Sequence, residues 1–240
     1  MMKLRNDKGL FTAEYSLIGE NHVTKGMENQ DQIKFGEFAS SVRFLVVSDG
    51  VSSAAHALLG ATAAVETVEK LAMDISSNKI LMNDIKAIQS YLVKHWKENF
   101  VADWNQYAAT LNFIIYYDHQ LLLGQLGDGL IALTVDGETK VMKNYEEFYS
   151  SETPALGEVV LRKDLKVESC FVNNSFSGYI VTDGIGKEVN EDSYMPLERY
   201  LFELSMNPEL FVKEIVPWID GLGAKNGDDK TLGYIRMEDL

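Results

Sequence analysis

The sequence is poor in the residues that cross-link or rigidify secreted domains. It has a single cysteine, Cys170, and only four prolines among 240 residues. One cysteine excludes an internal disulfide and a cysteine-rich zinc module, and it favours a reducing compartment. The chain opens with the polar run MMKLRNDKGLF, so we expect no signal peptide. These absences together predict a cytoplasmic protein.

Long hydrophobic runs and positive charges are also scarce. No run of about eighteen apolar residues occurs, so we expect no membrane-spanning helix and no membrane partner. Lys and Arg number 22 against 36 Asp and Glu, which gives a formal net charge of -14. Proteins that bind nucleic acid through its phosphates need the opposite balance, so we expect no nucleic-acid partner. Whether the acidic residues serve solubility alone, or some gather around cations, stays open at this point.

The remaining composition is that of a folded protein. Hydrophobic residues make up 46% and charged residues 24%, which is typical of globular chains and not of disordered ones. No Gly/Ser-rich linker or low-complexity tract divides the chain. We therefore predict a single domain over residues 1–240.

Apolar patterns predict strands, two helices, more strands, two further helices and a final strand. The expected strands are residues 11–18, 32–38, 42–47, 110–117, 121–126, 130–135, 138–142, 165–172, 178–181 and 231–237. The expected helices are residues 54–71, 83–99, 196–204 and a last one from Pro208 that ends or kinks at Pro217. The four strands within 110–142 have the pattern of a meander. This order favours antiparallel sheets with helices on their outer faces over alternating βαβ units.

Two strongly apolar strands, residues 44–50 and 179–184, each end at a hydroxyl residue followed by Asp-Gly. An Asp-Gly pair is usually a turn, as we predict for Asp136-Gly137. Asp49 and Asp183 differ because the strands that they end are buried, and an ionised carboxylate at the rim of a core needs a partner. Two such carboxylates brought together would repel each other unless a cation lay between them.

Three more acidic segments lie beside strands: Asn29-Gln30-Asp31, Gly127-Asp128-Gly129 and Gly227-Asp228-Asp229-Lys230-Thr231. A tight hairpin is the alternative interpretation for the second segment, and a solvated loop for the third. Oxygen ligands without Cys or His nearby favour Mg²⁺ or Mn²⁺ over zinc. Carboxylates at strand ends can assemble a two-metal site.

The order and spacing of these motifs, with Ala109-Thr110 between them, resemble the metal-dependent type 2C serine/threonine protein phosphatases. The likeness is greatest to the divergent bacterial branch, whose opening resembles the segment from Ile18 to His22 followed by Gly26. The motifs run from about residue 16 to residue 237. The resemblance implies an α+β fold, a four-layer α-β-β-α sandwich of two antiparallel sheets flanked by helices.

The resemblance also implies a site for two Mn²⁺ or Mg²⁺ ions. By it, Asp49 would bridge the two ions and the carbonyl of Gly50 would bind one of them. Asp183 and Asp228 would complete the site of the first ion, and Asp31 would hold the waters of the second.

Two further residues are assigned by the same resemblance. Asp128 with Asp183 would form a weaker third ion site, and Thr110 would lie near the metal-bound water. The implied activity is hydrolysis of phosphoserine and phosphothreonine in proteins by a water that bridges two divalent cations, which lower its pKa. The implied partners are a phosphoprotein substrate and the Ser/Thr kinase or signalling module that this branch accompanies.

The sequence departs from the family pattern at three places. The common Glu-Asp pair is Gln30-Asp31, the arginine that clamps the substrate phosphate is Gly26, and the usual His-Gly-Gly after Asp49-Gly50 is Val51-Ser52-Ser53. In place of the arginine we predict His22 or Lys25, and for Lys25 a solvated surface lysine is an equal alternative.

These departures keep two other functions open. One is a catalytically degenerate phosphatase fold that binds a partner or phosphopeptide without turnover. The other is a two-metal hydrolase of small phosphate esters. The retained carboxylates Asp31, Asp49, Asp183 and Asp228 argue against the degenerate form.

Overall fold

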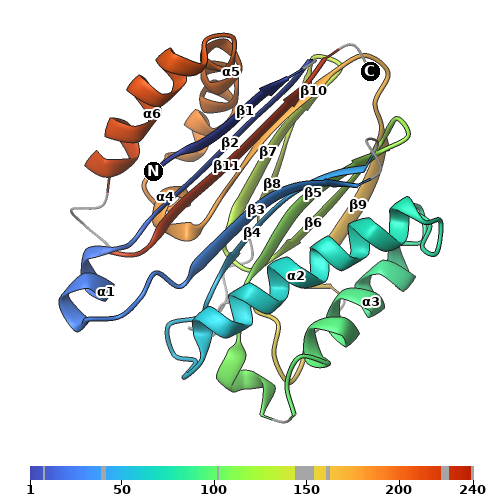
Figure 1. The fold of residues 1–240 in the computed structure, drawn as a ribbon, viewed down its shortest axis with the longest axis vertical. Helices are drawn as coiled ribbons and strands as arrows, with labels where there is room; N and C mark the ends of the chain where they lie inside the picture. Colours follow the sequence, from blue (N-terminus) through green and yellow to red (C-terminus); the bar gives the residue numbers. More distant parts are fainter. Residues whose placement is uncertain are drawn as a thin grey trace.

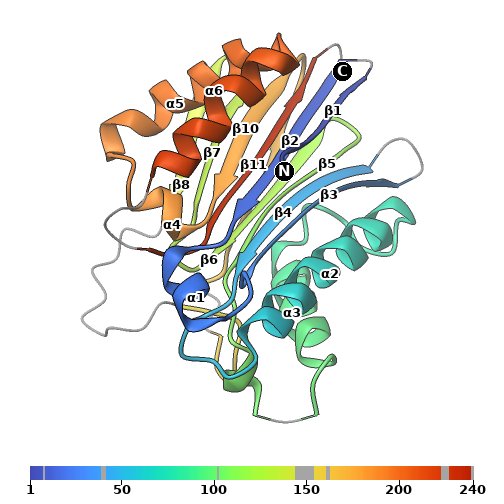
Figure 2. The same cartoon turned by 60° about the vertical axis from the view of Figure 1, so that its left-hand side comes forward.

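Two antiparallel β-sheets lie face to face, and helices cover the outer side of each sheet (Figures 1 and 2). The computed structural model describes residues 1–7, 9–38, 42–101, 103–143, 154–160, 163–222 and 227–238. This arrangement confirms the predicted α+β class and its four α-β-β-α layers.

Every strand pair in the two sheets is antiparallel. In the described part of the chain, the first sheet has the order β1-β2-β11-β10-β7-β8 and the second the order β3-β4-β5-β6-β9. The strands of the first sheet are β1 (Lys3–Asp7), β2 (Leu10–Leu17), β7 (Leu130–Val135), β8 (Glu138–Lys143), β10 (Phe176–Val181) and β11 (Lys230–Met237). Those of the second are β3 (Asp31–Phe38), β4 (Val42–Asp49), β5 (Leu111–Tyr117), β6 (Gln120–Leu126) and β9 (Lys166–Phe171).

Four long helices form the outer layers. Helices α2 (Ala57–Ser76) and α3 (Ile85–Lys97) cover the second sheet, and α5 (Tyr194–Ser205) and α6 (Pro208–Gly221) cover the first. Shorter pieces lie in the connections: α1 (Glu20–Lys25), α4 (Asp183–Gly186), η1 (Trp104–Tyr107) and η2 (Glu191–Ser193). Of the helices described, none combines the length and the apolar character that crossing a bilayer requires.

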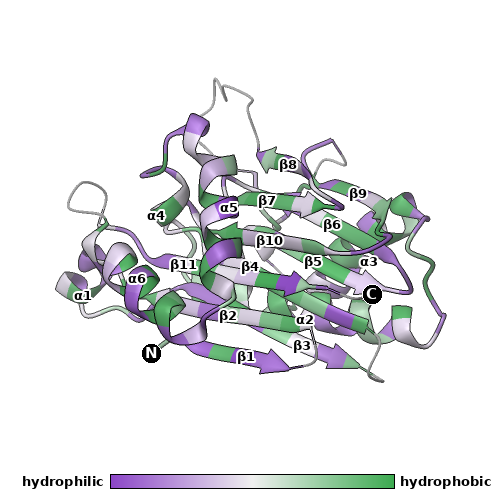
Figure 3. Cartoon of the chain, turned by 90° about the horizontal axis from the view of Figure 1, so that it is seen from above, coloured by the Kyte–Doolittle hydropathy of each residue, from purple (hydrophilic) through white to green (hydrophobic). Residues whose placement is uncertain are grey.

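The alternation of side chains along β4 shows how the layers form. Phe44 and Val46 pack against the cluster beneath α2 and α3, whereas Leu45 and Val47 face the other sheet. A third apolar layer, which includes Tyr179, lies between the first sheet and α5 and α6. In Figure 3 the central strands are mostly apolar, while the edge strand β1 is largely hydrophilic. A strand with two apolar faces therefore has helices on one side and a sheet on the other.

The predicted meander over residues 110–142 is wrong at its middle connection. The hairpins β5–β6 and β7–β8 form as expected, but β6 and β7 belong to different sheets. The chain crosses from one sheet to the other at Gly127-Asp128-Gly129, so this segment is not a hairpin turn. Both outcomes bury the same apolar strands, which is why the local pattern does not distinguish them.

Two other features differ from the sequence-based expectation. Strand β1 was not expected, because its sequence KLRND is polar and mostly exposed at the edge of the sheet. Helix α6 does not end at Pro217 but continues to Gly221. A proline inside a helix removes one backbone hydrogen bond and crowds the preceding turn, but the neighbouring Val216 and Trp218 pack against the core and favour continuation of the helix.

Candidate metal centre

The pairing of β3 with β4 places two carboxylates side by side. Asp31 is directly opposite Asp49 in the register of these antiparallel strands. Residues in that relation project from the same face of the sheet, with Cβ atoms about 5 Å apart. Asp31 is buried and Asp49 is half-buried. Like charges opposite each other are unfavourable, so this strand end favours a bound cation.

Other carboxylates at the same end of the sandwich come from the end of β10 and from the crossover between the two sheets. Asp183 follows β10 and begins the short helix α4, and Asp128 lies in the crossover between β6 and β7. Carboxylate oxygens of Asp49, Asp128 and Asp183 lie within 4.8 Å of one another. The structure thus brings together three acids that the sequence separates by as many as 134 positions (183 − 49).

The donor set fits a hard divalent cation. The Oδ1 atom of Asp183 is buried and has no hydrogen-bond partner among the described residues. The Oδ2 atom of Asp31 accepts a hydrogen bond of 2.8 Å from the hydroxyl of Thr182, which fixes its orientation. Asp228, half-buried before β11, accepts a hydrogen bond of 3.0 Å from the amide of Asp229. A cluster of carboxylate oxygens of this kind is what Mg²⁺ and Mn²⁺ prefer.

The electrostatics of the cluster point the same way. Burial, with the charges of Asp229 and Asp183, raises the pKa of Asp31 to about 7 despite the Thr231 and Thr182 hydrogen bonds. Burial within the cluster raises the pKa of Asp49 well above its ordinary value, and the charges of Asp31, Asp183, Asp228 and Asp128 add to the effect. The pKa of Asp183 is raised by burial and by the charge of Asp128. A divalent cation would offset the repulsion that causes these shifts.

Thr110 and Gly50 shape the end of β4. The hydroxyl of Thr110 accepts a hydrogen bond of 2.9 Å from the amide of Asp49, and the amide of Thr110 donates one of 2.8 Å to the carbonyl of Asp49. At Gly50, an added Cβ would lie 2.6 Å from the carbonyl of Ala57 at the start of α2. Thr110 therefore positions Asp49 in this structure, and Gly50 lets α2 approach the site.

The comparisons with known proteins agree with this geometry. The sequence matches the family model for protein phosphatase 2C over residues 18–219. The chain belongs to the protein phosphatase 2C family.

Solved structures of low sequence identity share its fold. RsbX, solved in complex with magnesium, superposes with a TM-score of 0.68 at 16% identity, over 99% of this chain and 100% of that one. The serine/threonine phosphatase of S. agalactiae has a TM-score of 0.64 at 13% identity, over 95% and 100%. The catalytic domain of the serine threonine protein phosphatase PstP, in complex with two manganese ions, has a TM-score of 0.63 at 16% identity, over 96% and 99%. No curated protein matches the chain.

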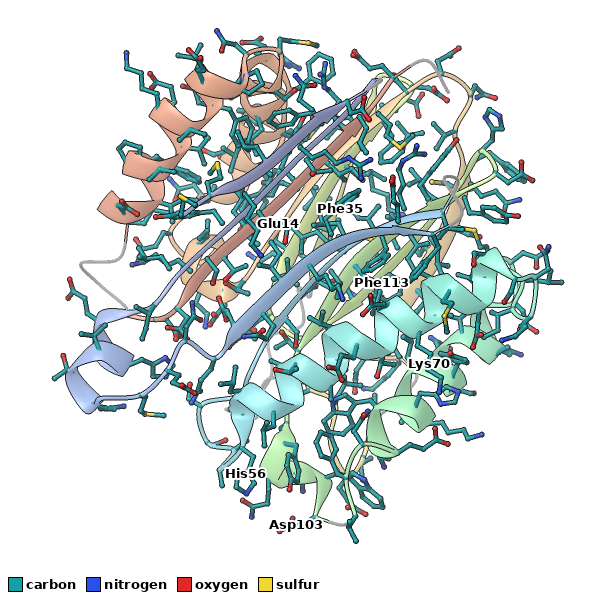
Figure 4. All side chains as sticks on the ribbon, in the orientation of Figure 1. Glu14, Phe35, His56, Lys70, Asp103 and Phe113 are labelled. Atoms are coloured by element: carbon teal, nitrogen blue, oxygen red, sulfur yellow. The ribbon has the colours of Figure 1, made fainter. Side chains whose placement is uncertain are left out.

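Two positions at which the sequence departs from the family pattern can now be placed in the structure. Gly26, which stands where the arginine is expected, ends α1 with φ 65°, and nothing lies within 4 Å of an added Cβ there. The loop Val51-Ser52-Ser53 carries no histidine. The next one along the chain is His56, labelled in Figure 4, and its ring centroid lies 5.0 Å from that of Tyr107.

Asp229 is a buried carboxylate that the sequence-based assignment passed over. Its Oδ1 accepts a hydrogen bond of 2.7 Å from the amide of Gly19, and its Oδ2 accepts one of 2.6 Å from the amide of Gln30. The same Oδ2 lies 2.8 Å from Nδ1 of His22. Asp229 thus joins α1 and the start of β3 to the start of β11. It follows Asp228 directly, and nothing in the spacing separates a ligand from a structural acid.

The two residues predicted to bind the substrate phosphate lie on α1 but differ in exposure. His22 is buried, and its Nδ1 is held by Asp229, so only the other ring nitrogen is left for a phosphate. Lys25 is exposed in the last turn of the helix. Helices α1 and α4 lie at the same end of the two sheets (Figures 1 and 2).

One cation, Lys187, contacts the carboxylates of Asp128 and Asp183, and the sequence-based assignment missed it. Its Nζ bonds to Oδ2 of Asp183 and lies 3.3 Å from Oδ2 of Asp128. Although burial acts in the opposite direction, the bond to Asp183 and the two negative charges raise the pKa of Lys187. The signal was present in the sequence, because Lys187 follows Asp183 by four residues, one turn of helix.

Behind the carboxylates, a buried amide pair supports the crossover between the sheets. Asn112 and Gln125 face each other across β5 and β6, and both are fully buried. Nε2 of Gln125 donates a hydrogen bond of 2.7 Å to the carbonyl of Gly129. An added Cβ at Gly129 would lie 2.5 Å from Nδ2 of Asn112, so only glycine fits beside Asp128.

Proposed function

We propose that this chain is a metal-dependent phosphatase that hydrolyses phosphoserine and phosphothreonine in proteins. The observation that carries the proposal is the approach of the Asp49, Asp128 and Asp183 carboxylates within 4.8 Å in a member of the protein phosphatase 2C family. Two of the structures that share its fold support the choice of ion, since RsbX was solved with magnesium and PstP with two manganese ions.

Five residues would hold the ions. Asp49 would supply carboxylate oxygens to both of the two ions, and the carbonyl of Gly50 would bind one of them. Asp183 and Asp228 would complete the first site, and Asp31 would hold the water shell of the second. When bound, Mn²⁺ or Mg²⁺ ions supply an activated water near neutral pH and offset the negative charge of the phosphoryl oxygens.

The rest of the site keeps these ligands in place. Thr110 holds the backbone of Asp49 through two hydrogen bonds, and Thr182 orients Asp31. Because the net charge of the protein is -14, an anionic substrate needs local positive charge to approach. We propose Lys25, with the second ring nitrogen of His22, as phosphate-binding groups of the chain itself.

The proposal is tested by measuring hydrolysis of p-nitrophenyl phosphate and of a phosphothreonine peptide with added Mn²⁺. Wild type should turn over both, chelation by EDTA should abolish turnover, and Asp183→Asn should reduce it to background. Asp7→Asn, which changes an exposed aspartate on β1, is the matched control and should keep full activity. Wild-type turnover no faster than that of Asp183→Asn would contradict the proposal.

A binding module without turnover is the second candidate. The observations that favour it are Gly26 and Val51-Ser52-Ser53, where the arginine and histidine of the family pattern are missing. In that case wild type would bind Mn²⁺ and a phosphopeptide by calorimetry yet release no phosphate. A hydrolase of small esters would instead cleave p-nitrophenyl phosphate and leave a panel of phosphopeptides intact.

A further inference from the structure

Lys187 occupies a definite place between two carboxylates of the candidate centre. Helix α4 begins at Asp183, and the amide of Lys187 donates a hydrogen bond of 2.9 Å to the carbonyl of Asp183. This single turn brings the ammonium back over the carboxylate from which the helix starts. There Nζ bonds to Oδ2 of Asp183 and lies 3.3 Å from Oδ2 of Asp128, on the crossover from the other sheet.

The pair Asp128 and Asp183 is the one assigned to a third ion by the family resemblance. A divalent cation that binds two carboxylates needs both oxygens about 2.0–2.2 Å away and tolerates no second cation among its ligands. The ammonium of Lys187 already contacts one oxygen of each. A third ion would therefore have to displace an attached cation and lose both ion pairs.

Lys187 also makes the two carboxylate oxygens of Asp183 unequal. It holds Oδ2, while the buried Oδ1 has no hydrogen-bond partner among the described side chains. One oxygen is thus bound within the chain and the other is left for an ion. A carboxylate held at one oxygen is pre-oriented, which lowers the cost of ordering it on ion binding.

We propose that Lys187 is a built-in cation that takes the place of the third metal ion, so that this chain binds two ions and not three. The inference rests on the proposed function, because the two remaining ions are those of the proposed catalytic centre. Lys187 is a positioning residue: it fixes Asp183 and Asp128 and sets the number of ions.

The test counts bound Mn²⁺ by equilibrium dialysis with elemental analysis and by native mass spectrometry. Wild type should bind two ions, and Lys187→Gln should bind a third, with an affinity at least about tenfold higher than any third-ion binding to wild type. Lys187→Arg keeps the positive charge and should remain at two. Lys140→Gln is the matched control, because Lys140 pairs with Glu168 on β9 and its side chain is 53% exposed against 55% for Lys187.

The outcomes separate this inference from the proposed function. Three ions bound to wild type, or two bound to Lys187→Gln, would overturn the inference even if the protein is an active phosphatase. Two ions in wild type and three in the variant would uphold it even if no phosphate is released. Binding of no ion to wild type would overturn both. Circular dichroism of each variant shows whether it has folded, which is expected because Lys187 is half-exposed.

Discussion

The dipeptide Asp-Gly occurs at two ends of the sandwich with opposite surroundings. Asp136-Gly137 joins β7 to β8, and Asp49-Gly50 ends β4. In the first, Oδ2 of Asp136 accepts a hydrogen bond of 2.8 Å from the amide of Asn173, and Oδ1 accepts bonds from the next two amides. In the second, the carboxylate of Asp49 faces other carboxylates.

The surroundings shift the pKa values of Asp136 and Asp49 in opposite directions. The backbone hydrogen bond from Asn173, and then that from Asn174, lower the pKa of Asp136 to about 2. Burial and four neighbouring acids raise the pKa of Asp49 well above its ordinary value. A turn aspartate is stabilised by the chain's own N–H groups, whereas the described neighbours of Asp49 raise its pKa, and a bound ion would offset their charge. The same two residues are thus a structural element in one place and a candidate ligand in the other.

The largest expected effect on activity comes from neutralising Asp49. Asp49→Asn should lower kcat/KM by about 10³-fold or more, since ion-based charge stabilisation is worth several kcal/mol. Without metal, the same variant should melt no lower than wild type near neutral pH, because it removes one of several repelling charges. Kinetics with Mn²⁺ and thermal melts in EDTA measure the two effects. A clearly lower melting temperature in EDTA would show that Asp49 is structural, as Asp136 is.

A smaller loss of activity is expected from substituting Asp229, the carboxylate that joins α1 to the start of β11. Asp229→Asn replaces an oxygen that accepts hydrogen bonds, so it weakens the links to Gly19, Gln30 and His22. Supporting residues of metal sites typically contribute about 10–100-fold, and kcat/KM should fall by that amount.

The control for this change is Asp220→Asn. Asp220 also joins two elements, since its Oδ1 accepts a hydrogen bond of 2.5 Å from the hydroxyl of Tyr15, but it has no part in the cluster. Its activity should stay within about twofold of wild type. Equal losses in the two variants would mean that Asp229 acts through stability alone.

Metal and pH should act on the stability of the same cluster. A raised carboxyl pKa means that the folded state binds protons more tightly, so metal-free stability should fall as pH rises from about 4 through about 7, the pKa of Asp31. Mn²⁺ at about 100 times its Kd should raise Tm near neutral pH by about 5–10 °C. At about pH 5 the increase should be smaller, because protons compete with the ion. Differential scanning fluorimetry across this range measures both trends, and an increase that is independent of pH would contradict them.

The smallest effect is expected at the turn aspartate. Asp136→Asn replaces one oxygen that accepts from the amides of residues 173–175, so Tm should fall while kcat/KM and the response to Mn²⁺ stay unchanged. The lowered pKa of Asp136 stabilises the fold above about pH 4, and this contribution is lost as pH falls toward about 2. The difference between wild type and variant should therefore shrink in acid, which acid titrations followed by circular dichroism measure.

Much of the fold was predictable because the local pattern of apolar residues indicates which side chains are buried. The strand over residues 42–47 alternates between two apolar faces, and both faces are buried. The last helix begins at Pro208 as predicted, and Asn207 caps it, with its Oδ1 accepting a hydrogen bond of 3.2 Å from the amide of Leu210. The polar strand β1 and the separation of β6 from β7 were not predictable in this way, since neither changes which residues are apolar.

For the site, the sequence by itself determined which carboxylates follow buried strands and, through their order, the family to which the chain belongs. Only the tertiary structure decided which of them meet, because β3 and β4 supply one pair and the crossover and β10 supply another. It also decided the partners of His22, which contacts an acid 207 positions away, and the position of Lys187 between Asp128 and Asp183. A carboxylate becomes a ligand, a turn cap or a structural anchor according to the donors and charges that face it, and those come from distant parts of the chain.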